Sequence, residues 1–317
     1  MGNELVPAAD SPSKSLETAV QAATDFIASS QAENTRRAYA ADWRDFTAWC
    51  SAHGLADRHV PGTVAAYLAH LATAGRKLKT IERRVTAIGW FHRQVSLDNP
   101  AAHPGVKATL EGIRRQLGTA PVKKAALTDE LLARALKKIP PDLAGLRDRA
   151  LLLLGFAGAL RRSELVALDV ADIARHPKGL VITIRRSKTD QAGAGKIKAV
   201  PHGRKLHTVR ALQAWLEAAT IAQGALFRGV RGTRVLPDRL CDRQVARIAK
   251  KRAAAIGLDA TLFAGHSLRS GFISSASDHD ASIAKIADHA GHAKLDTTRG
   301  YMQTADAFRD HPGKGFL

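Results

Sequence analysis

Six residues that could carry out phosphoryl transfer follow one another in the second part of the chain: Arg161, Lys188, His266, Arg269, His292 and Tyr301. His266 and Arg269 stand one turn apart on a predicted helix. Glu164, three residues after Arg161, is suited to holding that guanidinium. Each piece has an ordinary alternative, since an Arg-x-x-Glu pair is usually a surface ion pair and Lys188 would usually serve solubility. Their occurrence together in one predicted domain favours a shared active site.

These residue types fit the attack of a phenol on a DNA phosphodiester. In the transition state charge builds up on the non-bridging oxygens, and two guanidiniums can meet it bidentately without losing their protons. The loss of one such donor typically costs about 3 kcal/mol, or about a hundredfold in rate. A lysine can protonate the leaving sugar oxygen, and clustered positive charge with a nearby histidine helps the phenol to attack. The resulting phosphotyrosine ester stores the bond energy, so rejoining needs no ATP.

Other chemistries find little support in the sequence. Two distant cysteines, Cys50 and Cys241, cannot form a short-spaced zinc motif, and His289 with His292 lacks a third ligand nearby. The acidic residues are scattered, whereas a two-metal nuclease needs converging carboxylates. No GxxxxGK[ST] motif for a nucleotide is present. The sequence therefore predicts neither a metal nor a cofactor.

The charge balance points to a polyanionic partner. Lys and Arg number 48 against 29 acids, a formal net charge of +19, and such an excess is usually neutralised by nucleic acid. A basic surface that is merely solvated is the alternative. The longest apolar run, 11 residues from Ala150 to Leu160, is too short to span a bilayer, and no signal peptide is evident at the N-terminus. With both cysteines expected as packed thiols, we expect a cytoplasmic, nucleoid-associated protein that binds double-stranded DNA and no membrane.

Helical periodicity and one irregular segment divide the chain. Residues 1–14 are small and polar and are predicted to be a disordered tail. Apolar residues then recur at steps of three and four, with Asn34 as a candidate N-cap, and predict a helical domain over residues 15–117. Residues 118–127 contain Gly, Pro and two lysines and are predicted to be a linker.

The second domain, residues 128–317, is predicted to be mainly helical with a small antiparallel sheet. Leu143–Leu160 is apolar almost all round and predicts a buried central helix. Leu180–Ile184 and Lys196–Val200 predict a hairpin, and Gly291–Tyr301 is expected to be loop-like. Further helices are predicted near residues 205–221, 239–255, 267–277 and 282–290. The expected fold class is therefore mainly α, an N-terminal helical bundle followed by an α-rich catalytic domain.

The ordered set of six residues resembles the catalytic signature of the tyrosine recombinase (phage integrase) family. Further matches are R-x-S-E-L beginning at Arg161 and Gly-His…Thr-Thr…Tyr ending at Tyr301. The likeness extends over nearly the whole chain, because residues 15–117 resemble the family's SAM-like core-binding domain, with Asn34–Tyr39 in the expected place. The resemblance implies a simple two-domain site-specific recombinase.

The resemblance also implies a role for each residue. Tyr301 would be the nucleophile, forming a 3′-phosphotyrosyl link and freeing a 5′-hydroxyl. The scissile phosphate would be clamped by Arg161 and Arg269 and hydrogen-bonded by His292. Lys188 would be the general acid, and His266 would take the tyrosine proton or orient the phosphate. Family members act as homotetramers on two DNA sites through a Holliday junction, and their tail, here Met302–Leu317, commonly docks on a neighbouring subunit.

In the family the two domains form a C-shaped clamp around the duplex. Candidate DNA contacts here are Arg36, Arg37, Lys79, Arg83, Arg84, Lys123 and Lys124, although a solvated helix face is the alternative for any single one. Two other functions stay open. A type IB-like topoisomerase would use the same chemistry, but the compact two-domain layout argues against it. A non-catalytic DNA-binding regulator or architectural protein would have no reason to keep all six residues.

Overall fold

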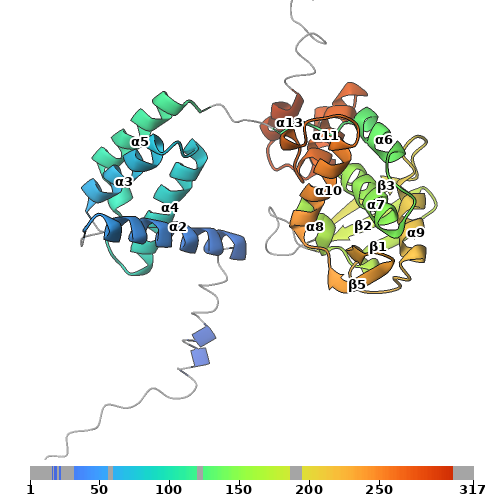
Figure 1. Ribbon diagram of the computed structural model, residues 1–317, viewed down its shortest axis with the longest axis horizontal. Helices are drawn as coiled ribbons and strands as arrows, with labels where there is room; N and C mark the ends of the chain where they lie inside the picture. The colour runs from blue at the N-terminus through green and yellow to red at the C-terminus, as the bar shows by residue number, and fades with distance from the viewer. Residues whose placement is uncertain are drawn as a thin grey trace, which may run out of the picture. The chain divides into compact units, whose positions relative to one another are not determined.

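The computed structural model describes residues 32–55, 60–119, 124–185 and 195–302, together with Leu16, Thr18, Ala19, Gln21 and Ala22. The predictions made for residues 1–14, for Lys123, for Lys188 and for the tail 303–317 lie outside these residues. The chain divides into two compact units, Met1–Pro121 and Val122–Leu317, each of which is drawn in Figure 1.

Among the described residues, the core of the first unit is formed by four α-helices. They are α2 (Glu33–Ala52), α3 (Pro61–Thr73), α4 (Leu78–Gln94) and α5 (Pro104–Leu117), with a 3-10 turn at Pro100–Ala102. Their apolar stripes meet in one core that includes Phe46, Leu68 and Ile88, as helical periodicity predicts. The helix α2 begins at Glu33 after an extended Ala32 without a side-chain cap, so Asn34 lies within its first turn and is not the N-cap.

The second unit surrounds a buried helix with further helices and two small sheets. Its helices are α6 (Asp129–Lys137), α7 (Leu143–Ala157), α8 (Arg162–Ala167), α9 (Thr208–Ala218), α10 (Asp242–Ala254), α11 (Ser267–Asp278), α12 (Ile283–Ala290) and α13 (Leu295–Met302). Its strands are β1 (Ile173–His176), β2 (Gly179–Ile184), β3 (Lys196–Pro201), β4 (Arg228–Arg231) and β5 (Arg234–Arg239). Strands β1, β2 and β3 form an antiparallel sheet in that order, and β4 pairs with β5.

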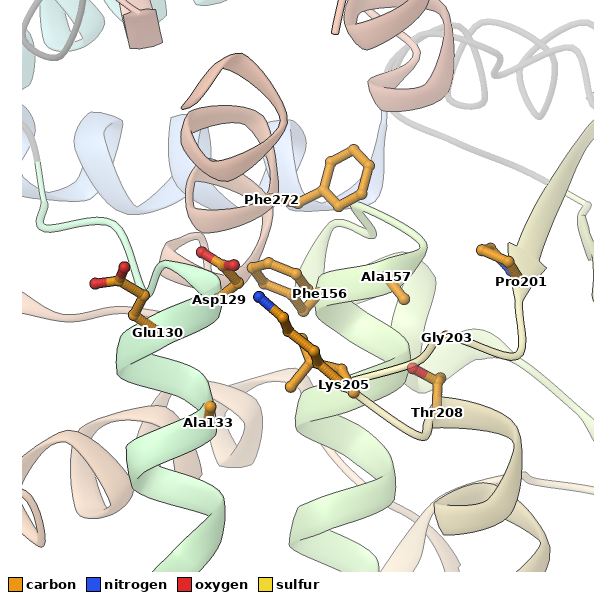
Figure 2. A pocket seen from close by; sticks show the side chains of 11 residues that line it. Asp129, Glu130, Ala133, Phe156, Ala157, Pro201, Gly203, Lys205, Thr208 and Phe272 are labelled. Atoms are coloured by element: carbon orange, nitrogen blue, oxygen red, sulfur yellow. The ribbon is translucent and has the colours of Figure 1, made fainter. Parts of the chain in front are cut away.

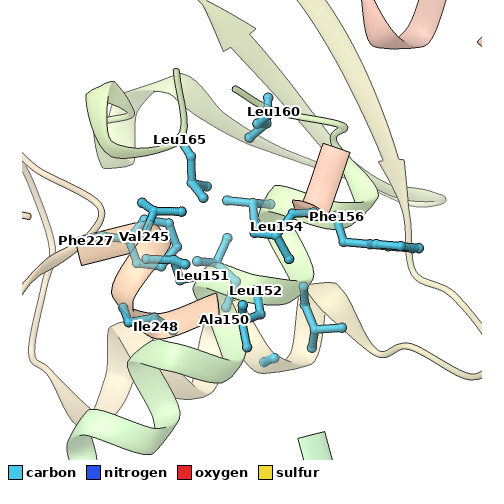
Figure 3. Packing of buried hydrophobic residues seen from close by; sticks show 14 of the residues in the cluster. Ala150, Leu151, Leu152, Leu154, Phe156, Leu160, Leu165, Phe227, Val245 and Ile248 are labelled. Atoms are coloured by element: carbon cyan, nitrogen blue, oxygen red, sulfur yellow. The ribbon is translucent and has the colours of Figure 1, made fainter. Parts of the chain in front are cut away.

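The core of the second unit forms around α7, which is buried along most of its length. Figure 3 shows Leu151, Leu152 and Leu154 of α7 packed with Leu165 and with residues of α10 such as Val245. Burial of side chains of this size contributes about 1.5–3 kcal/mol each. The predicted central helix is therefore present, and it ends at Ala157, just before the segment that leads to Arg161.

Several local features differ from the sequence-based expectations. The segment between Gly291 and Tyr301, expected to be loop-like, contains α13, and strands β1, β4 and β5 were not predicted. Residues 124–127, assigned to the linker, belong to the second unit and hydrogen-bond within it: the Ala125 N–H donates to the Leu262 carbonyl and the Leu127 N–H to the Ser267 carbonyl. Helix α11 approaches this segment so closely that a Cβ on Gly271 would lie 1.9 Å from the Leu127 carbonyl oxygen.

Three further observations bear on the expected class of protein. Among the residues that the structure covers, no helix is both long and apolar enough to cross a membrane. Nor do three or more His, Cys, Asp or Glu side chains in that part of the chain cluster as a metal site would require. Cys50 is buried, whereas Cys241 is exposed at the start of α10 and is therefore not the packed thiol that was expected.

Candidate active site

Four segments of the second unit bring five of the six predicted catalytic residues together. Arg161 lies directly before α8, and His266 directly before α11, which carries Arg269 in its first turn. His292 follows Gly291, which ends α12 in the left-handed conformation (φ 69°) that glycine adopts without strain. Tyr301 lies near the end of α13, which packs against both α11 and α12.

Tyr301 lies between the two histidines. Its hydroxyl is 2.7 Å from Nε2 of His266, and its ring stacks on that of His292 with centroids 5.8 Å apart and planes 12° from parallel. Nδ1 of His292 is in turn 2.8 Å from Oγ1 of Thr298, a fully buried side chain of α13. The phenol is therefore held at both its oxygen and its ring.

The two arginines are fixed by different partners. Glu164 accepts hydrogen bonds from Nη1 of Arg161 at 2.5 Å and from its backbone N–H at 2.9 Å, so the predicted Arg–Glu contact is present. Arg269 is 1% exposed, and its Nη1 donates to the Ala159 carbonyl at 2.8 Å. Its Nη2 is buried and has no hydrogen-bond partner among the described residues. An unpaired buried donor of this kind is costly in the free protein and calls for a ligand to complete it.

Burial and the nearby cations lower the pKa values of the neighbouring histidines. Burial, with Arg269 and Arg161 nearby, holds the pKa of His266 below its ordinary value and lowers that of His292 to about 4. Burial and Arg161 likewise lower the pKa of Arg269 to about 10. Both imidazoles are therefore neutral near pH 7. A neutral His266 that carries its proton on Nδ1 can accept the Tyr301 proton at Nε2.

The structure thus brings together Arg161, Glu164, His266, Arg269, His292 and Tyr301, while Lys188 lies outside the described residues. The flanking strands pair Ile184 with Lys196, so the segment that contains Lys188 connects these two strand ends. Sequence reasoning missed a second lysine, Lys198 of β3. It is 8% exposed and lines a small cavity together with Arg161, Glu164 and Gly291.

The candidate DNA contacts of the first unit have different surroundings. Arg37 and Lys79 are exposed and pair with Glu33 and Glu82, respectively. Arg83 is half exposed and binds Asp42 through two hydrogen bonds, and Arg36 is partly buried.

Arg84 stands apart from these, since it is 8% exposed and bound to Asp45 and Tyr67. That arrangement makes it a structural residue of the first unit. In the second unit, Lys124 is exposed, and its Nζ donates to the Thr261 carbonyl.

Helix α10 carries a basic face that sequence reasoning did not single out. It packs against α8, the helix that Arg161 precedes. Asp242 in the first turn of α10 forms an ion pair with Arg162 of α8, with Oδ2 and Nε 3.1 Å apart. The exposed cations of α10 are Arg243, Arg247, Lys250 and Lys251. Their helical spacing in the sequence is the signal that identifies them.

A pocket of about 460 Å³ lies elsewhere in the second unit, where α6, α7 and α11 meet the segment before α9 (Figure 2). Phe156 and Phe272 form its apolar wall, and Lys205 extends across it toward Asp129. None of the predicted catalytic residues that the structure describes lines it. Its two acids and single cation do not suit a polyanionic substrate, so the chemistry belongs to the arginine–histidine–tyrosine cluster.

Comparisons with known proteins show the family to which the chain belongs. Residues 126–307 match the model of the phage integrase family. The chain is 40% identical over 290 residues to an integrase/recombinase XerD homolog of Selenomonas ruminantium, covering 89% of this chain and 85% of that protein. It is 27% identical over 276 residues to the tyrosine recombinase XerC of Pseudomonas putida, with 85% of each chain covered.

Solved structures share the fold at lower sequence identity. A lambda integrase dimer bound to a COC′ core site superposes with a TM-score of 0.63 at 16% identity, covering 90% of this chain and 94% of that one. The XerH site-specific recombinase in a post-cleavage complex with a palindromic difH substrate gives a TM-score of 0.59 at 19% identity, covering 78% and 70%.

Fold, site and comparisons together define a tyrosine recombinase. The chain belongs to the phage integrase family, and it is an enzyme of the recombinase class. The expected fold class, a mainly helical protein with a small antiparallel sheet and a tyrosine recombinase catalytic domain, is confirmed.

Proposed function

We propose that this chain cleaves and rejoins double-stranded DNA at a specific site through a 3′-phosphotyrosyl intermediate at Tyr301. The observation that carries the proposal is the hydrogen bond of 2.7 Å between the Tyr301 hydroxyl and His266 in a cluster that also holds Arg161 and Arg269. Two structural relatives, a site-specific recombinase bound to its difH substrate and an integrase bound to a core site, support DNA as the partner.

In the proposed reaction the Tyr301 oxygen attacks phosphorus while its proton passes to Nε2 of His266. Arg161 and Arg269 neutralise the non-bridging oxygens, and the unpaired Nη2 of Arg269 gains an acceptor. The bond from phosphorus to the 5′ oxygen breaks, and Lys188 supplies the proton that this oxygen needs. In the reverse reaction a 5′-hydroxyl displaces the tyrosine, so the proposed rejoining step requires no ATP.

The charge that a metal ion would otherwise supply comes, in this proposal, from the guanidiniums. We further propose that four copies act on two DNA sites and exchange strands through a Holliday junction. The exposed cations Arg37 and Lys79 of the first unit, Lys124, and the basic face of α10 are the proposed phosphate contacts.

A nicked suicide substrate tests the proposal, because loss of the short fragment after cleavage traps the covalent intermediate. The substrate would carry the site recovered by selecting bound fragments from the chain's own genomic neighbourhood. In EDTA the wild-type chain should become covalently attached, and Tyr301→Phe should bind the DNA without attachment. Tyr39→Phe, which alters a tyrosine of the first unit, is the matched control and should behave as wild type. Trapping that requires magnesium, or that survives Tyr301→Phe, would overturn the mechanism.

The same protein and DNA site distinguish a recombinase from the two alternative functions. A topoisomerase of this chemistry relaxes supercoils without exchanging strands between two sites, and a DNA-binding regulator forms no covalent adduct. Exchange between two labelled sites therefore supports the proposal.

A further inference from the structure

Lys198 occupies a position in β3 where an apolar residue would be expected. The strand alternates between exposed and buried residues, with Lys198 and Val200 buried and Ile197 76% exposed. A lysine on the buried side loses its hydration, which is costly unless polar partners replace the water. Its burial therefore calls for a specific set of partners.

The partners of Lys198 are two backbone carbonyls at the ends of two helices. Its Nζ donates at 2.7 Å to the Gly158 carbonyl, at the end of α7, and at 2.7 Å to the His289 carbonyl, in the last turn of α12. Carbonyls at a helix C-terminus lack intrahelical partners and carry the negative end of the helix dipole, so a cation stabilises them. In the part of the chain that the structure covers, Lys198 forms no ion pair with a carboxylate.

Three consecutive carbonyls at the end of α7 are bound by side chains from three other elements. The His289 side chain of α12 hydrogen-bonds the Ala157 carbonyl at 2.8 Å. The Lys198 side chain of β3 binds the Gly158 carbonyl. The Arg269 side chain of α11 binds the Ala159 carbonyl. Ala159 has a φ of 45°, a strained conformation for a residue with a side chain, which surrounding contacts must maintain. Arg161 follows two residues later, so these bonds determine where its guanidinium lies.

Lys198 links this turn to the segment that carries His292. The His289 carbonyl lies three residues before His292, and Arg161 Nη2 is 3.5 Å from the Gly291 carbonyl between them. The Lys198 ammonium thus connects two backbone segments, the one that leads to Arg161 and the one that leads to His292. A neutral amine would bind the two carbonyls more weakly and would lose the attraction of the helix dipoles.

We propose that Lys198 is a positioning residue for DNA cleavage: its charged form ties the end of α7 to the end of α12 and so holds Arg161 and His292 around one phosphate. This inference rests on the proposed function. It differs from the role of Lys188, because Lys198 acts through the two carbonyls and transfers no proton to the substrate.

The proposal predicts a pH dependence. Burial, with Arg269, Arg161 and Lys196 nearby, lowers the pKa of Lys198 to about 8, and Glu164 opposes this effect. Lys198 is therefore charged below about pH 8 and becomes neutral as the pH rises through that value. The charged or titratable groups around it are Glu164 and Arg161 at the start of α8, Arg269 of α11, Lys196 of β3 and His289 of α12. Of the cations, Arg269 titrates at a higher pH, with a pKa of about 10.

The test uses the suicide substrate with a sulfur atom in place of the 5′ bridging oxygen at the scissile phosphate. Sulfur leaves as a thiolate without a proton, so the contribution of Lys188 as general acid drops out. The measured quantity is the second-order rate of covalent trapping from about pH 6.5 to 9.5, which reports the groups of the free enzyme. A phenolate attacks phosphorus more readily than a phenol does, so a fall in this rate with rising pH cannot come from the nucleophile.

The expected results distinguish a role of the Lys198 charge in positioning from a role of its side chain in packing alone. The wild-type rate should fall through about pH 8. Lys198→Met should be about 10- to 100-fold slower near pH 7, as for misplaced catalytic groups, and should lack that fall. Lys198→Arg, which stays charged, should also lack the fall and should recover part of the rate. The exposed Lys178→Met, in the turn between β1 and β2, should follow the wild type.

Three outcomes would overturn the inference. These are a wild-type rate that does not fall above pH 8, a Lys198→Met variant with the wild-type rate, and a slowed variant that keeps the alkaline fall. If Lys198→Met does not fold, the pH profile of the wild-type trapping rate and that of Lys198→Arg still test the inference. If Tyr301→Phe abolishes trapping while Lys198→Met trapping matches the wild type, this inference fails and the proposed function stands. If Tyr301→Phe is trapped, the proposed function itself fails.

Discussion

Glu164→Gln is expected to weaken both the fold and the reaction, because Glu164 is the anion held among three cations. Its carboxylate is 5% exposed and binds Arg161 through a side-chain and a backbone hydrogen bond. Its charge also opposes the lowering of the pKa values of Lys198 and Arg269 that burial causes. A hydrogen bond to a charged group contributes about 1.5–3 kcal/mol. Glutamine keeps an acceptor but loses the charge, so we expect a loss of about 2 kcal/mol in the free energy of unfolding.

The loss can be measured as a shift in melting temperature. For a unit of 150–250 residues, about 1 kcal/mol corresponds to roughly 2–4 °C, so Glu164→Gln should lower the melting temperature of the second unit by about 4–8 °C. Bound DNA should reduce this difference, since its phosphate supplies the missing negative charge. At saturating DNA the single-turnover rate of covalent trapping should fall about 10- to 100-fold, because Arg161 loses its orientation.

The matched control is Glu217→Gln, which removes an exposed carboxylate from α9 and should change neither quantity. The reasoning would be refuted if Glu164→Gln melted within about 1 °C of the wild type and cleaved at the wild-type rate.

Three further predictions follow from burial and charge. Because the pKa of His266 lies below its ordinary value of 6.5, His266 stays neutral above that pH. On the acid side the second-order trapping rate should therefore begin to fall only below about pH 6.5, and a midpoint of this acid limb above 6.5 would contradict the assignment. Asp148→Asn should destabilise the second unit by about 3–5 kcal/mol in chemical denaturation, since it leaves the buried Arg252 without its carboxylate. The control Asp238→Asn, at an exposed position, should leave the free energy of unfolding unchanged, and equal losses of stability in the two variants would argue against the buried pair. Lys79→Ala should reduce the slope of log affinity against log salt by about one if Lys79 contacts phosphate, and an unchanged slope would remove it from the interface.

The order of the catalytic residues was readable from the sequence, but the helix that carries the nucleophile was not. The segment Leu295–Met302 contains two threonines and a glycine, which are weak helix formers. It is helical because Thr298 is fully buried and Tyr301 packs with residues of α11 and α12. Tertiary contacts override the local preference here, and no periodicity reveals them.

Lys198 escaped prediction because β3 reverses the usual polarity of a strand. An alternating pattern assigns Ile197 to the core and Lys198 to solvent, whereas the structure exposes Ile197 and buries Lys198. The cause is the pair of carbonyls at the ends of α7 and α12, which come together only in the folded chain. Strands β4 and β5 were missed because Gly229 and Pro237 interrupt their pattern.

The adjacent arginines of α4 show a third limit of the sequence. Arg83 and Arg84 were grouped as one basic face, but Arg84 is buried against Asp45 and Tyr67, while Arg83 reaches Asp42. Which of two neighbouring cations is buried depends on acids some forty positions earlier in the chain. A helical wheel of α4 alone does not contain that information.

The most direct test of the mechanism identifies the amino acid that becomes joined to DNA. The chain has three tyrosines, and burial and the hydrogen bond with Asp45 raise the pKa of Tyr67. After trapping in EDTA and nuclease digestion, tandem mass spectrometry of the adduct should place the nucleotide on Tyr301, linked through its 3′ phosphate. A nucleotide on Tyr39, on Tyr67 or on a serine, or a link through the 5′ phosphate, would contradict the account.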